Sequence, residues 1–342
     1  MAFDGIVTKA IASELQQLSG ARVDKIFQPN SNNVIIGCYI NGKNYALNIC
    51  TNSNNYRIHL TTHPKPNPQI APNFCMVLRK HLTGLHIKNI ITANLERIIT
   101  IEFEGFDEVD DIINKKLIIE LMGKHCNIIL LNEENIIIDS LRHINNSDST
   151  HVVIPHTKYT YPSTEKLNFL NCNDFEDFKK HLSNVDTESL PWCISNTFNG
   201  ISKKFINFII SDLNIKDLKE IFYYLKQIIL DTDSLNLKFK TINNDYFLIV
   251  QDNDELFNLN FFIDDFYYQK ELSEDLKNYR NSMLKLILDT LKKYKKRLQN
   301  INKKLEECKN MNTYRLYGEL ITANLYKIKN VNISQIKLEN YY

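Results

Sequence analysis

The sequence contains few glycines and prolines and no cysteine pair of the CxxC type. Nine Gly and eight Pro in 342 residues are too few for a collagen-like or low-complexity chain. An apolar content of 43% is too high for a disordered chain. The seven cysteines are scattered along the chain, so neither a zinc site nor a thioredoxin-type motif is indicated, and we expect reduced thiols.

Motifs of catalysis and of export are also missing. The patterns HExxH, GxGxxG and GxSxG and the Walker loop do not occur. The longest apolar runs are only a few residues, well short of a membrane span. The N-terminus MAFDGIVTKA lacks the cationic and apolar regions of a secretory signal. These absences predict a cytoplasmic protein with no cofactor, no metal and no membrane partner, and they argue against a nucleotide-driven enzyme.

The formal net charge of +1 conceals a segregation of charge along the chain. Residues 266–342 contain 16 Lys and Arg and 8 Asp and Glu, whereas residues 1–265 contain 25 and 32. An acidic body of net charge −7 is therefore joined to a basic tail of net charge +8.

The first 165 residues have the pattern of an α+β domain dominated by antiparallel sheet. Apolar residues at helical spacing predict a helix over 4–19, and a second helix is expected at 73–82 after a Pro-rich stretch. Asn41-Gly42 is a strong hairpin signal between two β-branched runs. The expected strands are residues 22–27, 33–40, 45–51, 56–62, 87–93, 98–103, 117–122, 127–131 and 136–144.

Residues 170–232 change character and predict a small all-helical domain. Helices are expected at 173–183, 202–211 and 216–230, around a turn at 198–202. Residues 235–262 return to strands, at 237–241 and 246–251, which we expect to pack with the N-terminal domain.

A long helix beginning near residue 266 carries a coiled-coil seam. Apolar residues alternate spacings of three and four along it, and they are Leu284, Ile287, Leu291, Tyr294, Leu298, Ile301, Leu305 and Cys308. A seam needs a partner helix, and residues 312–327 could return antiparallel over it. They are too short to cover it, so we expect 266–342 to be a truncated coiled-coil arm and the chain to be the N-terminal part of something longer.

Four ordered blocks of sequence resemble one family. They are AFDGI with GARVDKIFQP at 20–29, PNFCMVLRKHL at 72–82, ELMGKHCNIILL at 120–131, and YRLYGELITANLY at 314–326. Together they are similar to the NFACT proteins, whose bacterial members are the FbpA/RqcH proteins, called fibronectin-binding proteins in older usage.

The resemblance implies an NFACT-N domain with a fold like that of the formamidopyrimidine-DNA glycosylase N-terminal domain, then a helix-hairpin-helix domain and a coiled coil. Ala2-Phe3 stands where those glycosylases have their catalytic proline and glutamate, so no glycosylase active site is expected. The implied role is that of a ribosome-associated quality-control factor that is not an enzyme. The implied partners are the large ribosomal subunit and its rRNA, a tRNA, tRNA-Ala in the bacterial members, and a stalled nascent chain. The alternative is a surface adhesin that binds fibronectin or fibrinogen.

The resemblance also singles out residues for tRNA binding and tailing. Asp4 matches a family aspartate, although the residues alone make it a helix N-cap. Glu96-Arg97 matches an Asp-Arg pair, with Glu in place of Asp. Arg97 could bind phosphate or stack on a base, or the pair could simply be a solvated turn. A third functional stretch, which could equally be a hairpin rim, matches Glu120, Leu121, Met122, Lys124, His125 and Asn127.

Further candidates for nucleic-acid contact follow from the residues themselves. Gly200 and Ser202 lie in a turn whose amides could face a phosphate, or which could be an ordinary turn between packed helices. Arg22 and Arg79 are weaker candidates, and for Arg79 a surface helix face is the preferred interpretation. A basic run without acidic partners, continued by Lys303 and Lys304, favours an rRNA-facing stripe over simple solvation. It comprises Lys292, Lys293, Lys295, Lys296 and Arg297.

Overall fold

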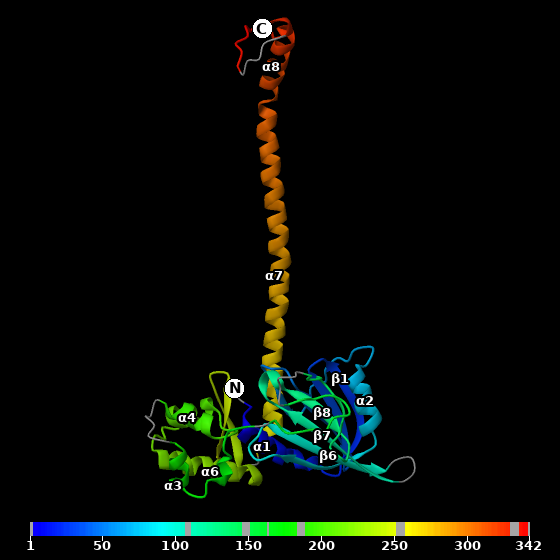
Figure 1. Ribbon diagram of the computed structural model, residues 1–342, viewed down its shortest axis with the longest axis vertical. Coiled ribbons are helices and arrows are strands. Elements are labelled where there is room, and N and C mark those ends of the chain that lie inside the picture. Colours follow the sequence, from blue (N-terminus) through cyan, green and yellow to red (C-terminus); the bar gives the residue numbers. More distant parts are fainter. Residues whose placement is uncertain are drawn as a thin grey trace. The chain divides into compact units, whose positions relative to one another are not determined.

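The computed structural model describes residues 3–106, 111–145, 151–162, 164–182, 189–250, 257–328 and 335–340. Contacts divide the chain into two compact units, Met1–Gln269 and Lys270–Tyr342. Figure 1 shows the secondary-structure elements of both.

The first unit is built on a nine-stranded antiparallel sheet in the order β4-β3-β2-β1-β5-β6-β7-β8-β9. The α+β class and the antiparallel sheet predicted from the sequence are confirmed. The strands are β1 (Arg22–Asn30), β2 (Asn33–Ile40), β3 (Lys43–Cys50), β4 (Arg57–Leu60), β5 (His86–Thr92), β6 (Ile98–Phe106), β7 (Ile112–Glu120), β8 (Asn127–Leu131) and β9 (Ile137–Ser140). Asn41 and Gly42 both have positive φ, as a type I′ hairpin turn requires.

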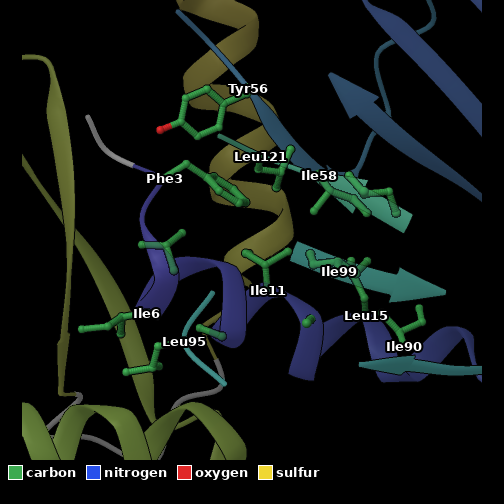
Figure 2. Packing of buried hydrophobic residues seen from close by; sticks show 14 of the residues in the cluster. Phe3, Ile6, Ile11, Leu15, Tyr56, Ile58, Ile90, Leu95, Ile99 and Leu121 are labelled. Atoms are coloured by element: carbon green, nitrogen blue, oxygen red, sulfur yellow. The ribbon is translucent and has the colours of Figure 1, made fainter. Parts of the chain in front are cut away.

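Side chains that alternate along the strands pack into two hydrophobic cores, one on each face of the sheet. One face is covered by α1 (Gly5–Leu15) and the short helix η1 (Gln16–Leu18), and Figure 2 shows Ile11 and Leu15 of α1 packed with Ile90 and Ile99 of the sheet. Ile98, the neighbour of Ile99, points to the other face and joins a smaller core there. Helix α2 (Asn73–Leu82) has the bounds that the sequence predicts.

The helical part of the first unit comprises η3 (Phe169–Asn171), α3 (Phe175–His181), α4 (Leu190–Thr197), α5 (Lys203–Ser211) and α6 (Leu218–Ser234). Helix α4 was not among the predicted helices, and it begins with Pro191 in its first turn. Strands β10 (Leu237–Ile242) and β11 (Asp245–Val250) pair with each other in a separate sheet and contact α6. Their buried side chains belong to the same hydrophobic core as those of α1 and the nine-stranded sheet. Residues 183 and 251, which end two of the expected elements, lie outside the described residues.

Helix α7 (Leu259–Lys309) begins within the first unit, before residue 266 where the sequence predicts it, and continues into the second. It is followed by α8 (Met311–Ala323) and α9 (Leu325–Ile328). The expectation that 312–327 return antiparallel over the seam is wrong, because α8 continues beyond the end of α7 (Figure 1). The seam residues are exposed: Leu284, Ile287, Leu291, Tyr294, Leu298, Ile301, Leu305 and Cys308.

All seven cysteines are free thiols. Among the described residues, no helix is long and apolar enough to cross a membrane.

Candidate nucleic-acid interface

Three segments far apart in sequence touch through their backbones in the first unit. The Gly5 amide donates a hydrogen bond to the Gly200 carbonyl oxygen over 2.9 Å. A Cβ atom placed on either glycine would lie 2.0 Å from the carbonyl oxygen of Leu95. Gly200 also has φ of +76°, a conformation that glycine adopts readily. The start of α1, the β5–β6 turn and the α4–α5 turn therefore meet at one point, which requires glycine at two positions.

Asp4 lies at this point and links two helix N-termini. Its Oδ1 accepts a hydrogen bond from the Val7 amide (3.2 Å) as the N-cap of α1, and its Oδ2 accepts one from the Ser202 hydroxyl (2.8 Å). Ser202 in turn is the N-cap of α5 and accepts from the Phe205 amide. Burial raises the pKa of Asp4, and the hydrogen bonds from Ser202 and Val7 and the charge of Arg97 oppose that rise. The N-cap interpretation of Asp4 is confirmed, and the carboxylate faces the α4–α5 turn at the same time.

Arg97 and Asp4 line one cleft of the first unit. The Arg97 guanidinium donates to the Tyr56 hydroxyl over 3.0 Å. The cleft has a volume of about 230 Å³ and is open to solvent on one side. Its lining residues are Phe3, Asp4, Gly5, Tyr56, Arg97, Lys166, Ser195, Asn196, Asn199, Gly200, Ile201, Ser202 and Lys203. The structure thus brings together four residues that the sequence singles out separately.

The cleft has a positive balance of charge. Arg97, Lys166 and Lys203 line it against the one carboxylate of Asp4. The Lys166 ammonium donates to the Ser195 carbonyl oxygen over 2.6 Å. Burial, together with the charge of Arg97, lowers the pKa of Lys166, as expected for cations held close together. A concave site with three cations favours an anionic group such as a phosphate.

Glu96 and Glu120 do not line this cleft. Ile98 pairs with Glu120, so the β5–β6 turn lies next to the end of β7. Glu120 is buried, and its Oε1 lies 2.8 Å from the Tyr159 hydroxyl and 2.9 Å from Nε2 of His151. The hydrogen bond to Glu120 raises the pKa of His151, and burial raises that of Glu96. This group is a carboxylate held by two partners, separate from the cationic cleft.

The rest of the predicted 120–127 stretch divides into structural and exposed residues. The Leu121 amide donates to the Arg97 carbonyl oxygen over 2.8 Å, and its side chain is buried in the main core. Asn127 is buried, with its amide bonded to the Arg142 backbone, so it fixes a turn. Met122 packs against the smaller core. Lys124 and His125 are exposed on the short helix η2 (Gly123–His125).

The remaining predicted contacts do not line the cleft. Arg22 is exposed and lies 3.8 Å from Asp24. Arg79 donates to the Ile26 carbonyl oxygen over 2.8 Å and fastens α2 to β1. The basic run is exposed on α7, and it comprises Lys292, Lys293, Lys295, Lys296 and Arg297.

Several residues of the cleft were not singled out from the sequence, among them Tyr56, Lys166 and Lys203. Tyr56 ends a polar turn rich in Asn and Ser, and Lys166 follows a Pro-containing segment. Neither carries a local pattern that marks it, because both reach the cleft through contacts with distant segments. Ser195 and Asn196 at the end of α4 were missed together with that helix.

The chain is an α+β protein with a nine-stranded antiparallel sheet, a helical region and one long helix, α7. A family model described as "NFACT N-terminal and middle domains" matches residues 4–342, and the chain belongs to this family. The Rqc2 homolog RqcH of Bacillus subtilis (strain 168) is 31% identical over 361 residues, which cover 100% of this chain and 62% of that protein. The Rqc2 homolog RqcH of Streptococcus suis is 29% identical and is covered to 61%. The chain thus spans less than two thirds of the length of these relatives.

Solved structures agree with this assignment. The N-terminal part of the fibronectin/fibrinogen-binding protein from Streptococcus suis superposes with a TM-score of 0.65 at 28% identity, covering 79% of this chain and 100% of that one. The fibrinogen binding protein from Staphylococcus aureus gives a TM-score of 0.65 at 30% identity, covering 78% and 99%.

Proposed function

We propose that this chain is the RNA-binding part of a ribosome-associated quality-control factor and that the cleft holds tRNA. The observation that carries the proposal is the convergence of Asp4, Arg97 and Ser202 from three distant segments on one solvent-open cleft. Two relatives named Rqc2 homolog RqcH support a role in ribosome-associated quality control.

The chemistry of the cleft suits a nucleic-acid backbone or an unstacked base. The planar Arg97 guanidinium can bind a phosphate with two hydrogen bonds or stack on a base. Its hydrogen bond to Tyr56 fixes the direction from which the guanidinium approaches. Lys166 and Lys203 add positive charge at the rim. Asp4 holds Ser202 and the start of α5 in place, so the cations keep a fixed spacing.

In this account the protein makes no peptide bond itself. It binds a stalled large ribosomal subunit and presents a tRNA, which we propose to be tRNA-Ala. The ribosome then extends the nascent chain with the amino acid that this tRNA carries. The exposed cations of α7 contact rRNA phosphates. Lys124 and His125, exposed at the end of β7, extend the surface that tRNA contacts.

The test is charge reversal in the cleft with a matched reversal elsewhere. We expect Arg97→Glu to weaken binding of fluorescein-labelled tRNA-Ala by about tenfold or more, because it removes a charge-assisted hydrogen bond and adds repulsion. Lys43→Glu is the control, since Lys43 is exposed at the start of β3 and does not line the cleft. Equal affinities for the two variants would exclude the cleft as the tRNA site.

A second candidate function is binding of a matrix protein, because two similar structures carry the names fibronectin/fibrinogen-binding and fibrinogen binding. Cell fractionation separates the two. Co-sedimentation with large ribosomal subunits supports the RNA-binding function, and exposure on intact cells supports the adhesin.

A further inference from the structure

Strand β4 and the residue before it present side chains to two different neighbours. Tyr56 and Ile58 point into the core covered by α1, and Figure 2 shows both there. Arg57 and His59 alternate with them and point to the first residues of α7. All of these residues belong to the first unit. One short segment therefore joins the cleft, through Tyr56, to the start of α7.

The first residues of α7, 259–269 (the α7 root), are held by buried polar contacts. The Glu14 carboxylate of α1 accepts a hydrogen bond from the Asn260 amide over 2.9 Å, and the Asn260 side-chain oxygen accepts from the Leu60 amide over 2.8 Å. One turn later, Asp264 accepts from the Thr62 amide over 2.7 Å. These contacts fix both the position and the rotation of the α7 root against β4.

Asp264 also binds two side chains of the same segment. It accepts from the Thr61 hydroxyl over 2.6 Å and lies 3.3 Å from Nε2 of His59. Although burial acts to raise the pKa of Asp264, the hydrogen bonds from His59, Thr61 and Thr62 hold it below its ordinary value. The carboxylate is therefore charged when it holds the helix.

Arg57 and Tyr267 connect this root to the cleft residue Tyr56. The Arg57 guanidinium is buried and lies 4.2 Å from the centre of the Tyr267 ring. The Tyr267 hydroxyl lies 3.3 Å from that of Tyr246, which holds the ring in place. A cation and a ring at this distance attract each other, more strongly when both are removed from water.

We propose that Arg57 and Tyr267 are positioning residues for the cleft and couple the α7 root to Arg97. Tyr267 holds the Arg57 side chain, which restrains the backbone of the preceding residue, Tyr56. The Tyr56 hydroxyl in turn accepts a hydrogen bond from the Arg97 guanidinium over 3.0 Å. The proposal rests on the proposed function in one respect: tRNA is the ligand whose affinity reports the position of Arg97.

Coupling of this kind is reciprocal. If the α7 root changes the affinity of the cleft for tRNA, tRNA must stabilise the α7 root by the same factor. The coupling passes through the Tyr56 hydroxyl, so a chain without that hydroxyl must lose it in both directions.

The test is a double-mutant cycle on binding of fluorescein-labelled tRNA-Ala. We expect Tyr267→Leu to weaken binding by about threefold to tenfold in the wild-type background, and by less than about twofold in a Tyr56→Phe background. Tyr267→Phe keeps the ring over Arg57 but loses the hydroxyl contact with Tyr246, so it should weaken binding less than Tyr267→Leu does. Tyr223→Leu is the matched control, because Tyr223 is an exposed tyrosine of α6.

Equal weakening by Tyr267→Leu in both backgrounds, or none in either, would overturn the proposal. Hydrogen exchange of residues 259–269 provides a second measurement, which does not depend on whether Tyr267→Leu folds. tRNA should slow exchange there in the wild-type chain and not in Tyr56→Phe, and the same slowing in both chains would contradict the coupling. A wild-type chain that does not bind tRNA would instead refute the proposed function.

Discussion

The close approach of Gly200 to the Leu95 carbonyl oxygen can be tested by comparing alanine substitutions at Gly200 and at Gly42. Gly200 and Gly42 have nearly the same φ, +76° and +75°, but a Cβ atom would meet the Leu95 carbonyl oxygen at 2.0 Å in the first case and nothing within 4 Å in the second. Alanine in this left-handed conformation costs about 1–2 kcal/mol of folding free energy. Forced overpacking costs about 1–3 kcal/mol more.

We therefore expect Gly42→Ala to lower the free energy of unfolding by about 1–2 kcal/mol and Gly200→Ala to lower it by about 2–5 kcal/mol. Urea unfolding followed by circular dichroism measures both. The difference between the two variants isolates the contact with Leu95, since the backbone conformations match. Equal losses would refute the close approach on which the geometry of the cleft depends.

Three further predictions concern Ser202, His59 and the basic run of α7. Ser202→Ala should lower the unfolding free energy by about 1 kcal/mol, and by more if Asp4 cannot replace the lost hydrogen bond, as measured by the same urea titration. Burial lowers the pKa of His59 from 6.5 to about 4, so the unfolded chain binds the proton at a higher pH than the folded chain does. His59 therefore contributes on the order of 3 kcal/mol to the free energy of unfolding above pH 6.5, and this contribution is lost as the pH falls towards 4. His59→Gln should flatten that part of the stability profile, and an unchanged slope would contradict the burial of a neutral imidazole. The five cations of α7 to be replaced by Gln are Lys292, Lys293, Lys295, Lys296 and Arg297. If they contact rRNA, their replacement should reduce the slope of log affinity for large ribosomal subunits against log salt concentration by about 0.7–0.9 per lost contact.

Elements with a strong local signal were predictable from the sequence. Helix α2 follows a Pro-rich stretch and has the expected bounds, and the Asn41-Gly42 turn forms as its residue types require. Strand β7 begins at Ile112, earlier than residue 117, because the polar Lys115 and Lys116 interrupt the apolar pattern while pairing with β6 holds them in the sheet. Helix α4 was not predicted because it is short, and short helices are stabilised by tertiary packing, which a local sequence pattern does not reveal.

The members of the site were more predictable than their arrangement. The family resemblance singles out Asp4 and Arg97, and Ser202 lies in a recognisable turn, but no local pattern indicates that the three residues meet. Their meeting depends on backbone contacts between segments almost 200 residues apart, such as that of Gly5 with Gly200. Tyr56 takes part through a hydroxyl whose partner is known only once β4 lies beside the β5–β6 turn.

Sequencing the RNA that co-purifies with the wild-type chain and with Arg97→Glu tests the central claim most directly. We expect one tRNA family to be enriched on the wild-type chain and lost from Arg97→Glu, while Lys43→Glu retains it. Absence of tRNA from the wild-type chain, or the same tRNA on all three proteins, would contradict the assignment of the cleft.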